Sequence, residues 1–343
     1  MEQKILSIGI AAYNMEKYLR RCIDSLLIPE IDKLEIIIVN NASTDSTPEI
    51  AQEYYNKYPN SIKVINIDVN GHYGKAVNHA LKNATGKYFK LLDADDWYDT
   101  KGLSTFVNVL SHSDVDLIIT NVSIEYANGK KAKHIIAKNV EYGKIIKRGT
   151  NEFKKIDFYA NIGMHKIAYK TSILHNMHFS MTENIPYVDN EYAYYPFKYI
   201  NSVLFINTIL YKYFIGREGQ TINQSSMVKN SLSLLKVITK MLDQYTETSL
   251  SYENQLFSTL YLRNTLALYY HTKLIVQGND KKENEKLKEL DTLVKIKGNK
   301  LYKLLGKTTY KKIPYIYIWR KTGIHIIPTN LYHIAKSFIH KLK

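Results

Sequence analysis

Four closely spaced aspartates are the residues of this chain best suited to chemistry. Residues 86–100 read GKYFKLLDADDWYDT, in which an apolar run leads directly into Asp93, Asp95, Asp96 and Asp99. Carboxylates this close repel one another, and each costs free energy unless a cation or a ligand compensates its charge. Mg²⁺ or Mn²⁺ accepts carboxylate and phosphate oxygens together, so the cluster could hold a diphosphate through a metal. The alternative is a solvated turn whose aspartates cap the next helix.

The elements that must position this cluster alternate between strand and helix patterns. Short apolar runs predict strands at residues 5–10, 34–39, 62–67, 87–92 and 115–121. Amphipathic stripes lie between them, with Asn14 expected to cap the first helix and Thr47 the second. This βαβαβ order predicts an α/β fold with a Rossmann-like, mostly parallel, doubly wound sheet.

Polar residues follow three of these strands at their carboxyl ends. They occupy residues 11–14, 40–45 and 93–96. Ligands of doubly wound sheets bind beyond the carboxyl ends of the strands, so we expect the three segments to meet at one crevice. Neither a dinucleotide-binding glycine motif nor a P-loop follows any strand. Clustered aspartates without a glycine phosphate cradle favour a diphosphate that is held through a metal.

Composition and charge narrow the class of protein. The single cysteine, Cys22, excludes an internal disulfide framework and a cysteine-based zinc site, and it fits a reducing, cytoplasmic compartment. Its place on an apolar helix face favours a core residue over a nucleophile. No apolar run reaches the roughly 18 residues that a membrane-spanning helix needs. Of the net charge of +15, residues 292–343 carry 12 Lys or Arg and no acid, which leaves +3 (15 − 12) for residues 1–291.

Three segments together resemble glycosyltransferase family 2. They read IGIAAYNMEKYLRRCIDSLL, EIIIVNNASTDST and GKAVNHALKNATGKYFKLLDADDW, and the resemblance covers residues 1–219. It implies a bacterial-type, inverting enzyme with the GT-A fold, which uses Mn²⁺ or Mg²⁺ and a UDP-sugar donor. The acceptor would be a glycan, a glycolipid or a glycoprotein. Hexosyl transfer in polysaccharide or glycoprotein glycan biosynthesis is the expected activity.

The expected domains follow from where these motifs end. A GT-A catalytic domain is expected at residues 1–224, with a nucleotide-sugar half at about 1–121 and an acceptor half at about 122–224. Over residues 225–343 the pattern changes to long helices, which predicts a helical, basic C-terminal domain.

The resemblance assigns the nucleotide to the ends of the first two strands. Tyr13 would stack on the uracil, beside Ala11 and Ala12, whose main chain would hydrogen-bond the base. Asn40 and Asn41 stand where the family has carboxylates that contact base and ribose. An amide can still accept from the uracil N3–H, and it can also donate. The two asparagines therefore leave the choice of nucleotide open.

Three further residues each keep two interpretations. Asp45 could contact the nucleotide or help to cap the following helix. Lys75 and Asn78, at the start of the third helix, could reach the nucleotide or lie on a solvated helix face.

The resemblance also implies the metal ligands. Asp93 would hold ribose or metal, Asp95 would ligate the metal directly, and Ala94 lies between them in the donor site. Asp96 would brace the loop. His165 belongs to a more loosely matching segment, and it is either a metal or diphosphate contact or a structural histidine.

Two downstream segments would complete the site. TENIPYVDNEYAYYPF, residues 182–197, resembles the family's acidic element at the head of an acceptor-side helix, so Asp189 would be the general base. Glu191 is a close rival, and an acid that only favours the helix N-terminus is the alternative. Residues 211–223 resemble a loop that closes over the donor, in which Arg217 could pair with phosphate.

The residues of the crevice also bear on three other classes of protein. A nucleic-acid-binding protein would suit the high positive charge, but it predicts basic residues around the crevice, where Asp and Asn stand instead. We therefore expect no nucleic-acid partner. A nucleotidyltransferase would begin with a glycine- and arginine-rich phosphate loop, which AAYNMEKY lacks. A non-catalytic sugar-nucleotide binder stays open because of Asn40 and Asn41.

The basic C-terminal region has two open roles. Its last stretch mixes Trp319, tyrosines and isoleucines with lysines. This composition suits a peripheral anchor at the inner face of a membrane, and it suits a homo-oligomer interface with a basic rim. Pro314 and Pro328 break the continuous amphipathic helix that an anchor lying on lipid would need, which favours the oligomer.

Overall fold

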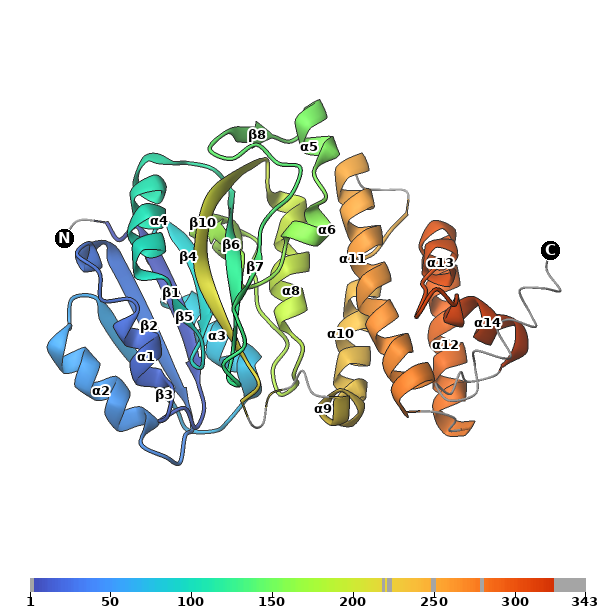
Figure 1. Cartoon of the computed structure of the whole chain (residues 1–343), viewed down its shortest axis with the longest axis horizontal. Coiled ribbons are helices and arrows are strands. Elements are labelled where there is room, and N and C mark those ends of the chain that lie inside the picture. The colour runs from blue at the N-terminus through green and yellow to red at the C-terminus, as the bar shows by residue number, and fades with distance from the viewer. Residues whose placement is uncertain (1–2, 218–219, 221–223, 248–250, 278–280, 324–343) are drawn as a thin grey trace. The chain divides into compact units, whose positions relative to one another are not determined.

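The computed structural model of the chain divides into two compact units, residues 1–220 and 221–343. Its elements are shown in Figure 1. The residues that the structure describes are 3–217, 220, 224–247, 251–277 and 281–323.

The first unit is built on one sheet, which has ten strands among the described residues. The strands are β1 (Leu6–Ala12), β2 (Leu34–Asn41), β3 (Ile62–Ile67), β4 (Tyr88–Asp93), β5 (Trp97–Tyr98), β6 (Leu117–Tyr126), β7 (Lys133–Ile135), β8 (Ile145–Lys147), β9 (Ile167–Lys170) and β10 (Ser202–Ile215). Their order is β3-β2-β1-β4-β9-β6-β10-β5, with β7 paired to β6 and β8 to β10. The strands β1 to β4 run parallel, as do β6 and β10, and β9 is antiparallel to both of its neighbours. The predicted mostly parallel sheet is confirmed, and because β6 crosses residue 121, the two predicted halves share it.

Helices cover both faces of this sheet. They are α1 (Leu19–Asp24), α2 (Thr47–Lys57), α3 (His72–Lys82), α4 (Thr100–His112), α5 (Asn151–Lys155), α6 (Phe158–Asn161), α7 (Thr171–Asn176) and α8 (Asp189–Tyr194), with the 3₁₀ turns η1 (Ile31–Lys33) and η2 (Pro196–Tyr199). Residues of α1, α2 and α4, including the fully buried Cys22, share one core cluster with Ile8 and Ile10 of β1. On the opposite face α3 packs closely against Gly9, where a Cβ would lie 3.0 Å from the Cβ of Ala80. The sheet is therefore doubly wound, and Cys22 is a core residue as expected.

The predicted helix caps after β1 and β2 were wrong. Asn14 does not cap α1, which begins at Leu19. Instead Asn14 has a φ of 54°, and its side-chain oxygen accepts a hydrogen bond from the N–H of Thr44 at 2.9 Å. Thr47 is the first residue of α2 rather than its cap, and its hydroxyl accepts from the N–H of Met15 at 2.7 Å. Each side chain instead accepts a hydrogen bond from a main-chain N–H of the other loop, Asn14 from Thr44 and Thr47 from Met15. These N–H groups need an acceptor, and the two side chains lie within reach.

The second unit is helical in its described residues. Its helices are α9 (Gln224–Lys229), α10 (Ser231–Asp243), α11 (Tyr252–His271), α12 (Lys281–Lys297), α13 (Asn299–Gly306) and α14 (Tyr315–Thr322), with a π-helical turn η3 (Thr272–Gln277). Leu262 and Leu266 of α11 and Leu305 of α13 are completely buried within it. No helix in the described part of the chain combines the length and the apolar character that crossing a membrane requires.

Trp319 lies inside the helical unit rather than on its surface. It is 3% exposed, and its indole N–H donates to Oδ1 of Asn284 at 2.8 Å. Tyr315 and Ile316 of the same helix are buried as well. These side chains fill the core of the unit, so Trp319 is not available to meet a membrane or a second subunit. Pro328 and the rest of residues 324–343 lie outside the described residues, and the membrane and oligomer roles of that stretch stay predictions.

Candidate active site

Three strand ends meet at one edge of the sheet. The parallel register sets Ala12 of β1 beside Asn40 of β2, and Ala11 of β1 beside Asp93 of β4. The polar segments that follow these strands therefore lie together at the carboxyl edge, where ligands of doubly wound sheets bind. Tyr13 comes next after β1 and is 45% exposed, so its ring is accessible to a flat ligand such as a base.

Asp45 joins the loops that follow β1 and β2. Its carboxylate accepts hydrogen bonds from the N–H of Glu16 at 3.1 Å and from the N–H of Thr47 at 3.0 Å. The second bond lies at the start of α2, so the structure shows the capping alternative. Contact of Asp45 with a nucleotide stays a prediction.

Asn40 and Asn41 are buried and are hydrogen-bonded within the chain. Asn40 accepts from the N–H of Ser43 at 3.1 Å and donates to Oδ1 of Asn66 on β3 at 3.0 Å. Asn41 accepts from the N–H of Gly71 at 3.2 Å, just before α3. An ionised carboxylate could not donate to Asn66, which gives a physical reason for an amide at position 40. The two asparagines tie β2 to β3 and to the start of α3.

Lys75 and Asn78 of α3 also have partners in the chain. Lys75 Nζ donates to the carbonyl oxygen of Val69 at 3.2 Å. The Asn78 amide donates to the carbonyl oxygen of Met181 at 3.0 Å and accepts from the Met181 N–H at 2.8 Å. Asn78 thereby fastens α3 to the segment that precedes α8. Contact of either side chain with a nucleotide stays a prediction.

The clustered aspartates have different partners. Asp99 caps α4 by accepting from the N–H of Gly102 at 2.9 Å. Asp96 is completely buried, and it accepts from the Tyr211 hydroxyl at 2.6 Å and from the Phe214 N–H at 2.7 Å. Burial, followed by the charges of the two preceding aspartates, raises the pKa of Asp96 to about 9. Burial therefore favours the neutral form of Asp96, and its two hydrogen bonds brace the turn against β10.

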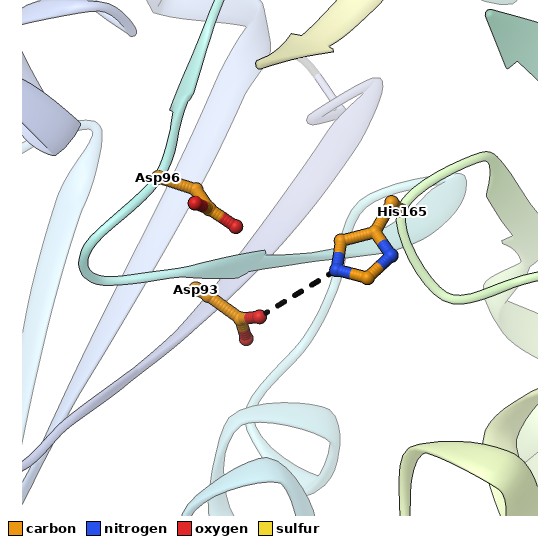
Figure 2. A group of neighbouring side chains, drawn as sticks. All are labelled: Asp93, Asp96 and His165. Atoms are coloured by element: carbon orange, nitrogen blue, oxygen red, sulfur yellow. Dashed lines mark ion pairs between the residues drawn. The ribbon is translucent and has the colours of Figure 1, made fainter. Parts of the chain in front are cut away.

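Asp93 and His165 face each other at the centre of the site (Figure 2). Oδ2 of Asp93 lies 3.9 Å from Nε2 of His165, and Oδ1 of Asp93 is buried with no hydrogen-bond partner among the described residues. Burial, followed by the charge of Asp95, raises the pKa of Asp93 to about 7. Burial lowers the pKa of His165 to about 3, and the charges of Lys90 and Lys166 act in the same direction. The imidazole is therefore neutral and can offer a ring nitrogen to a cation.

This corner of the site fits a divalent cation. Ligand atoms of Asp93, Asp96 and His165, one from each, all lie within 4.8 Å of one another. A cation beside the unpartnered oxygen of Asp93 would compensate the charge that burial disfavours, and carboxylate oxygens suit Mn²⁺ or Mg²⁺. The sequence indicated Asp95 rather than Asp96 as the third ligand. In the structure Asp96 lies in this group with both of its oxygens already hydrogen-bonded, and Asp95 is paired with another side chain.

Asp95 is held by two arginines from distant parts of the chain. Arg217, in the segment after β10, forms an ion pair through its Nε with Oδ2 of Asp95. Arg21 of α1 donates to the carbonyl oxygen of Asp95 at 2.8 Å, and its guanidinium stacks 3.8 Å from the centre of the Trp97 ring. The predicted phosphate contact Arg217 thus lies beside one of the two aspartates predicted to bind the metal.

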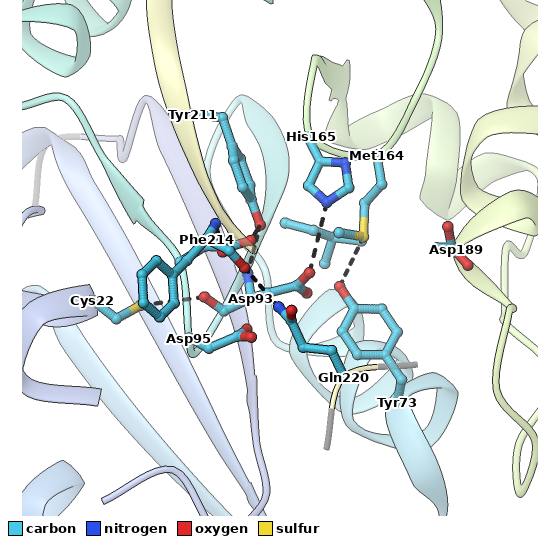
Figure 3. A network of polar contacts seen from close by, with 12 residues as sticks. Cys22, Tyr73, Asp93, Asp95, Met164, His165, Asp189, Tyr211, Phe214 and Gln220 are labelled. Atoms are coloured by element: carbon cyan, nitrogen blue, oxygen red, sulfur yellow. Dashed lines mark hydrogen bonds and ion pairs between the residues drawn. The ribbon is translucent and has the colours of Figure 1, made fainter. Parts of the chain in front are cut away.

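Tyr73 and Met164 are site residues that the sequence did not indicate. Figure 3 shows the Tyr73 hydroxyl pointing to Met164, and the hydroxyl donates to Sδ at 3.0 Å. Burial, followed by the charge of Asp93, raises the pKa of Tyr73, so its hydroxyl keeps its proton. The only hint in the sequence was an aromatic residue at the start of α3, two residues after Gly71, at the carboxyl end of β3. Such a residue is usually a core residue.

Two acids begin the helix that was expected to carry the general base. Asp189 is the first residue of α8, and burial raises its pKa. In Figure 3 Asp189 and Asp93 lie on opposite sides of Tyr73, and the charges of both act on the Tyr73 hydroxyl. Glu191 is completely buried and accepts from the N–H and from the hydroxyl of Thr182, both at 2.7 Å. The carboxylate of Glu191 therefore holds the preceding segment in place.

Known proteins resemble this chain in sequence and in fold. Residues 7–174 match the family described as Glycosyl transferase family 2. EpsH of Bacillus subtilis is 28% identical over 301 residues, which cover 86% of this chain and 75% of EpsH. S. aureus TarS 1–349, solved in complex with UDP-GlcNAc, has a TM-score of 0.68 at 18% identity and covers 93% of this chain and 92% of that one.

A second solved structure is more distant. The mannosyltransferase PcManGT from Pyrobaculum calidifontis, solved in complex with GDP-Man and Mn²⁺, has a TM-score of 0.53 at 13% identity. The likeness covers 89% of this chain and 86% of that one. Because these sequence identities are low, the two structures provide evidence about the fold alone. They confirm the expected architecture of a GT-A sheet followed by a helical region.

Proposed function

Because this chain belongs to glycosyl transferase family 2 and is a glycosyltransferase, we propose that it transfers a sugar from a UDP-sugar with inversion and with the help of a divalent metal. The acceptor is a hydroxyl group of a glycan or glycoconjugate. One observation carries the proposal. At the carboxyl edge of the sheet, the half-buried carboxylate of Asp93 has one buried oxygen without a hydrogen-bond partner and faces the neutral imidazole of His165.

The donor nucleotide binds at the ends of β1 and β2. Tyr13 stacks on the base with its exposed ring, and the main chain of Ala11 and Ala12 lines the site beside it. A UDP-sugar is supported by TarS, which was solved with UDP-GlcNAc. The buried Asn40 and Asn41 keep the loops around the base in place through their hydrogen bonds to β3 and α3.

The diphosphate is held next to the aspartates. Asp93 and His165 would hold Mn²⁺, and Asp95 would join them once Arg217 leaves it for a phosphate oxygen. Mn²⁺ is supported by PcManGT, which was solved with that ion. When bound, the cation neutralises the negative charge of the leaving diphosphate. Asp96, which accepts a hydrogen bond from Tyr211, keeps the turn that carries Asp93 and Asp95 fixed.

Asp189 removes the proton of the acceptor hydroxyl. The acceptor oxygen forms a bond to the anomeric carbon from the face opposite the diphosphate, the bond from that carbon to the phosphate oxygen breaks, and UDP leaves. The proton passes to Asp189. A pKa raised by burial makes Asp189 a stronger base than an ordinary aspartate, which brings its basicity closer to neutral pH. Glu191 is less suited to the task because Thr182 already occupies both of its oxygens.

A release assay tests the proposal. The full chain is incubated with UDP-, GDP- and dTDP-sugars, with and without Mn²⁺, and free nucleoside diphosphate is measured; Asp189→Asn is the matched control. We expect Mn²⁺-dependent release from UDP-sugars that the control lacks. Release from GDP-sugars alone would contradict the UDP assignment. Tight UDP-sugar binding without release in the presence of glycan acceptors would support a non-catalytic nucleotide-sugar binder instead.

A further inference from the structure

Lys90 is a buried lysine with no carboxylate partner among the residues that the structure describes. It lies in β4, three residues before Asp93, and its side chain is completely buried. Its Nζ donates to the carbonyl oxygens of His165 at 2.9 Å and of Ile167 at 3.1 Å. Burial disfavours the charged form of Lys90 and lowers its pKa to about 7, whereas an aliphatic residue would fill a strand position without that cost. The lysine therefore calls for a reason other than packing.

The two carbonyl groups mark the point where β4 and β9 separate. These antiparallel strands pair at Tyr88 with Lys170 and at Phe89 with Tyr169. Continuing that register along both strands would set Asp93 directly opposite His165. The ladder ends before this point, and the two side chains face each other instead, with 3.9 Å between Oδ2 and Nε2. The candidate metal site lies beyond the last paired residues of these two strands.

The carbonyl groups of the segment that enters β9 alternate between its two neighbours. The carbonyl of Lys166 accepts from Thr120 of β6, through the N–H at 2.9 Å and the hydroxyl at 3.2 Å. The carbonyls on either side of it, of His165 and Ile167, accept from Lys90 of β4. The Lys90 amino group thus takes the place of main-chain donors that a continued β4–β9 ladder would have supplied.

We propose that Lys90 is a positioning residue, whose side-chain amino group spans the gap between β4 and β9 and fixes the main chain that carries His165 beside Asp93. Lys90 contacts the main chain of one candidate ligand, and it lies on the strand that delivers the other. Removing it would leave the part-buried carbonyl oxygen of His165 and the buried one of Ile167 without this donor, and it would free the His165 segment to move. The inference rests on the proposed metal site, because the geometry that Lys90 maintains is that of Asp93 and His165.

Lys90→Met tests this role, since methionine keeps the approximate length and volume of lysine and removes the donor. Calorimetry measures UDP binding to the full chain with Mn²⁺ and with EDTA. Loss of a group that orients a metal ligand typically lowers metal affinity by about 10–100-fold. We expect a loss of that size in Mn²⁺-dependent UDP binding and no change in metal-free UDP binding. Lys90→Arg keeps a cationic donor, so we expect it to recover part of the affinity.

Lys273→Met is the matched control. Lys273 is also buried, at 3% exposure, but it lies in the second unit, where it donates to Ser231 Oγ at 2.8 Å and pairs with Glu283 at 2.5 Å. Its substitution removes a buried ammonium without touching the candidate metal site. It should lower thermal stability while leaving both UDP affinities as in the wild type.

The possible failures are distinguishable. If Mn²⁺ does not change the UDP affinity of the wild-type chain, the proposed metal-dependent function itself is wrong. A wild type that responds to Mn²⁺, together with a folded Lys90→Met variant that responds equally, would overturn the role of Lys90 alone. If Lys90→Met does not fold, Lys90→Gln decides, because its shorter, neutral amide cannot reach both carbonyl oxygens. A loss confined to Mn²⁺-dependent binding supports the role, and wild-type Mn²⁺ affinity overturns it.

Discussion

The guanidinium group of Arg217 is ion-paired with the carboxylate of Asp95, although 122 positions separate the two residues. Asp95 belongs to the turn after β4, and Arg217 follows β10, where Gly216 turns the chain with a φ of 102°. In the proposed reaction Asp95 binds the metal and Arg217 binds the diphosphate. The ion pair therefore engages two side chains that the donor needs. When the donor binds, this ion pair must break, so that Asp95 can contact the cation and Arg217 can contact a phosphate oxygen.

Arg217→Ala should have opposite effects on the metal and on the nucleotide. Without UDP, Mn²⁺ should bind more tightly, because Asp95 has lost a competing partner. With Mn²⁺ present, UDP should bind about tenfold more weakly or worse, since a hydrogen bond to a charged group contributes about 1.5–3 kcal/mol. Calorimetry measures both affinities. Arg20→Ala is the control, because Arg20 pairs with Glu53 on the exposed surface and should leave both unchanged. Weaker Mn²⁺ binding by Arg217→Ala would argue against the exchange.

Asp189→Asn should lower the rate of transfer by about 10²–10⁴-fold, the usual contribution of a positioned base. The donor affinity should stay nearly unchanged, because the base acts on the acceptor. Burial raises the pKa of Asp189, and a base must be deprotonated, so the rate should fall with decreasing pH at a higher pH than an ordinary aspartate would give. Initial rates from pH 4 to pH 8 measure this limb of the profile. Normal transfer by Asp189→Asn with an inactive Glu191→Gln would move the role to Glu191.

Glu35 links pH to the stability of the first unit. It is buried in β2 and accepts hydrogen bonds from Lys63 Nζ at 2.6 Å, from the Thr85 N–H at 2.7 Å and from the Ser7 hydroxyl. Burial alone would raise the pKa of Glu35, but these hydrogen bonds outweigh it and lower the pKa. A pKa lowered by folding adds stability above the ordinary value of about 4.3, and this stability is lost as the pH falls through the lower, folded-state value.

Glu35→Gln should therefore destabilise the first unit at neutral pH by about 2 kcal/mol, the size of a hydrogen bond to a charged group. The difference from the wild type should shrink below about pH 4, where the wild-type carboxylate also becomes protonated. Hydrogen exchange of the β1 and β2 amides measures the local stability. Glu53→Gln should have little effect because its ion pairs are exposed to solvent. A constant difference between wild type and Glu35→Gln from pH 7 to pH 3 would contradict this assignment.

Much of the first unit could be predicted because its core strands are short apolar runs that are recognisable in the sequence. The predicted strand at residues 62–67 coincides with β3, and the convergence of Ala11, Asn40 and Asp93 follows from parallel order alone. The start of α1 could not be predicted in this way. Asn14 resembles a cap in the sequence, but its partner, Thr44, comes from the next loop.

The roles of the individual aspartates could not be read from their spacing. Asp95 and Asp96 are adjacent, yet one binds Arg217 and the other Tyr211, which lie 122 and 115 positions away. Such partners depend on where β10 lies in the sheet, and a local sequence pattern carries no information about that. Lys90 is the converse case. A lysine within an apolar strand was visible in the sequence, but only the separation of β4 and β9 gives it a reason.

The central claim is that Asp93 and Asp95 hold the donor diphosphate through a divalent cation. UDP titration of the wild type, Asp93→Asn and Asp95→Asn, each with Mn²⁺ and with EDTA, tests it most directly, and thermal unfolding checks that each variant is folded. We predict that the wild type binds UDP more tightly with Mn²⁺ and that both variants lose this gain while they keep their metal-free affinity. A folded Asp95→Asn variant that binds UDP with unchanged Mn²⁺ dependence would contradict the claim.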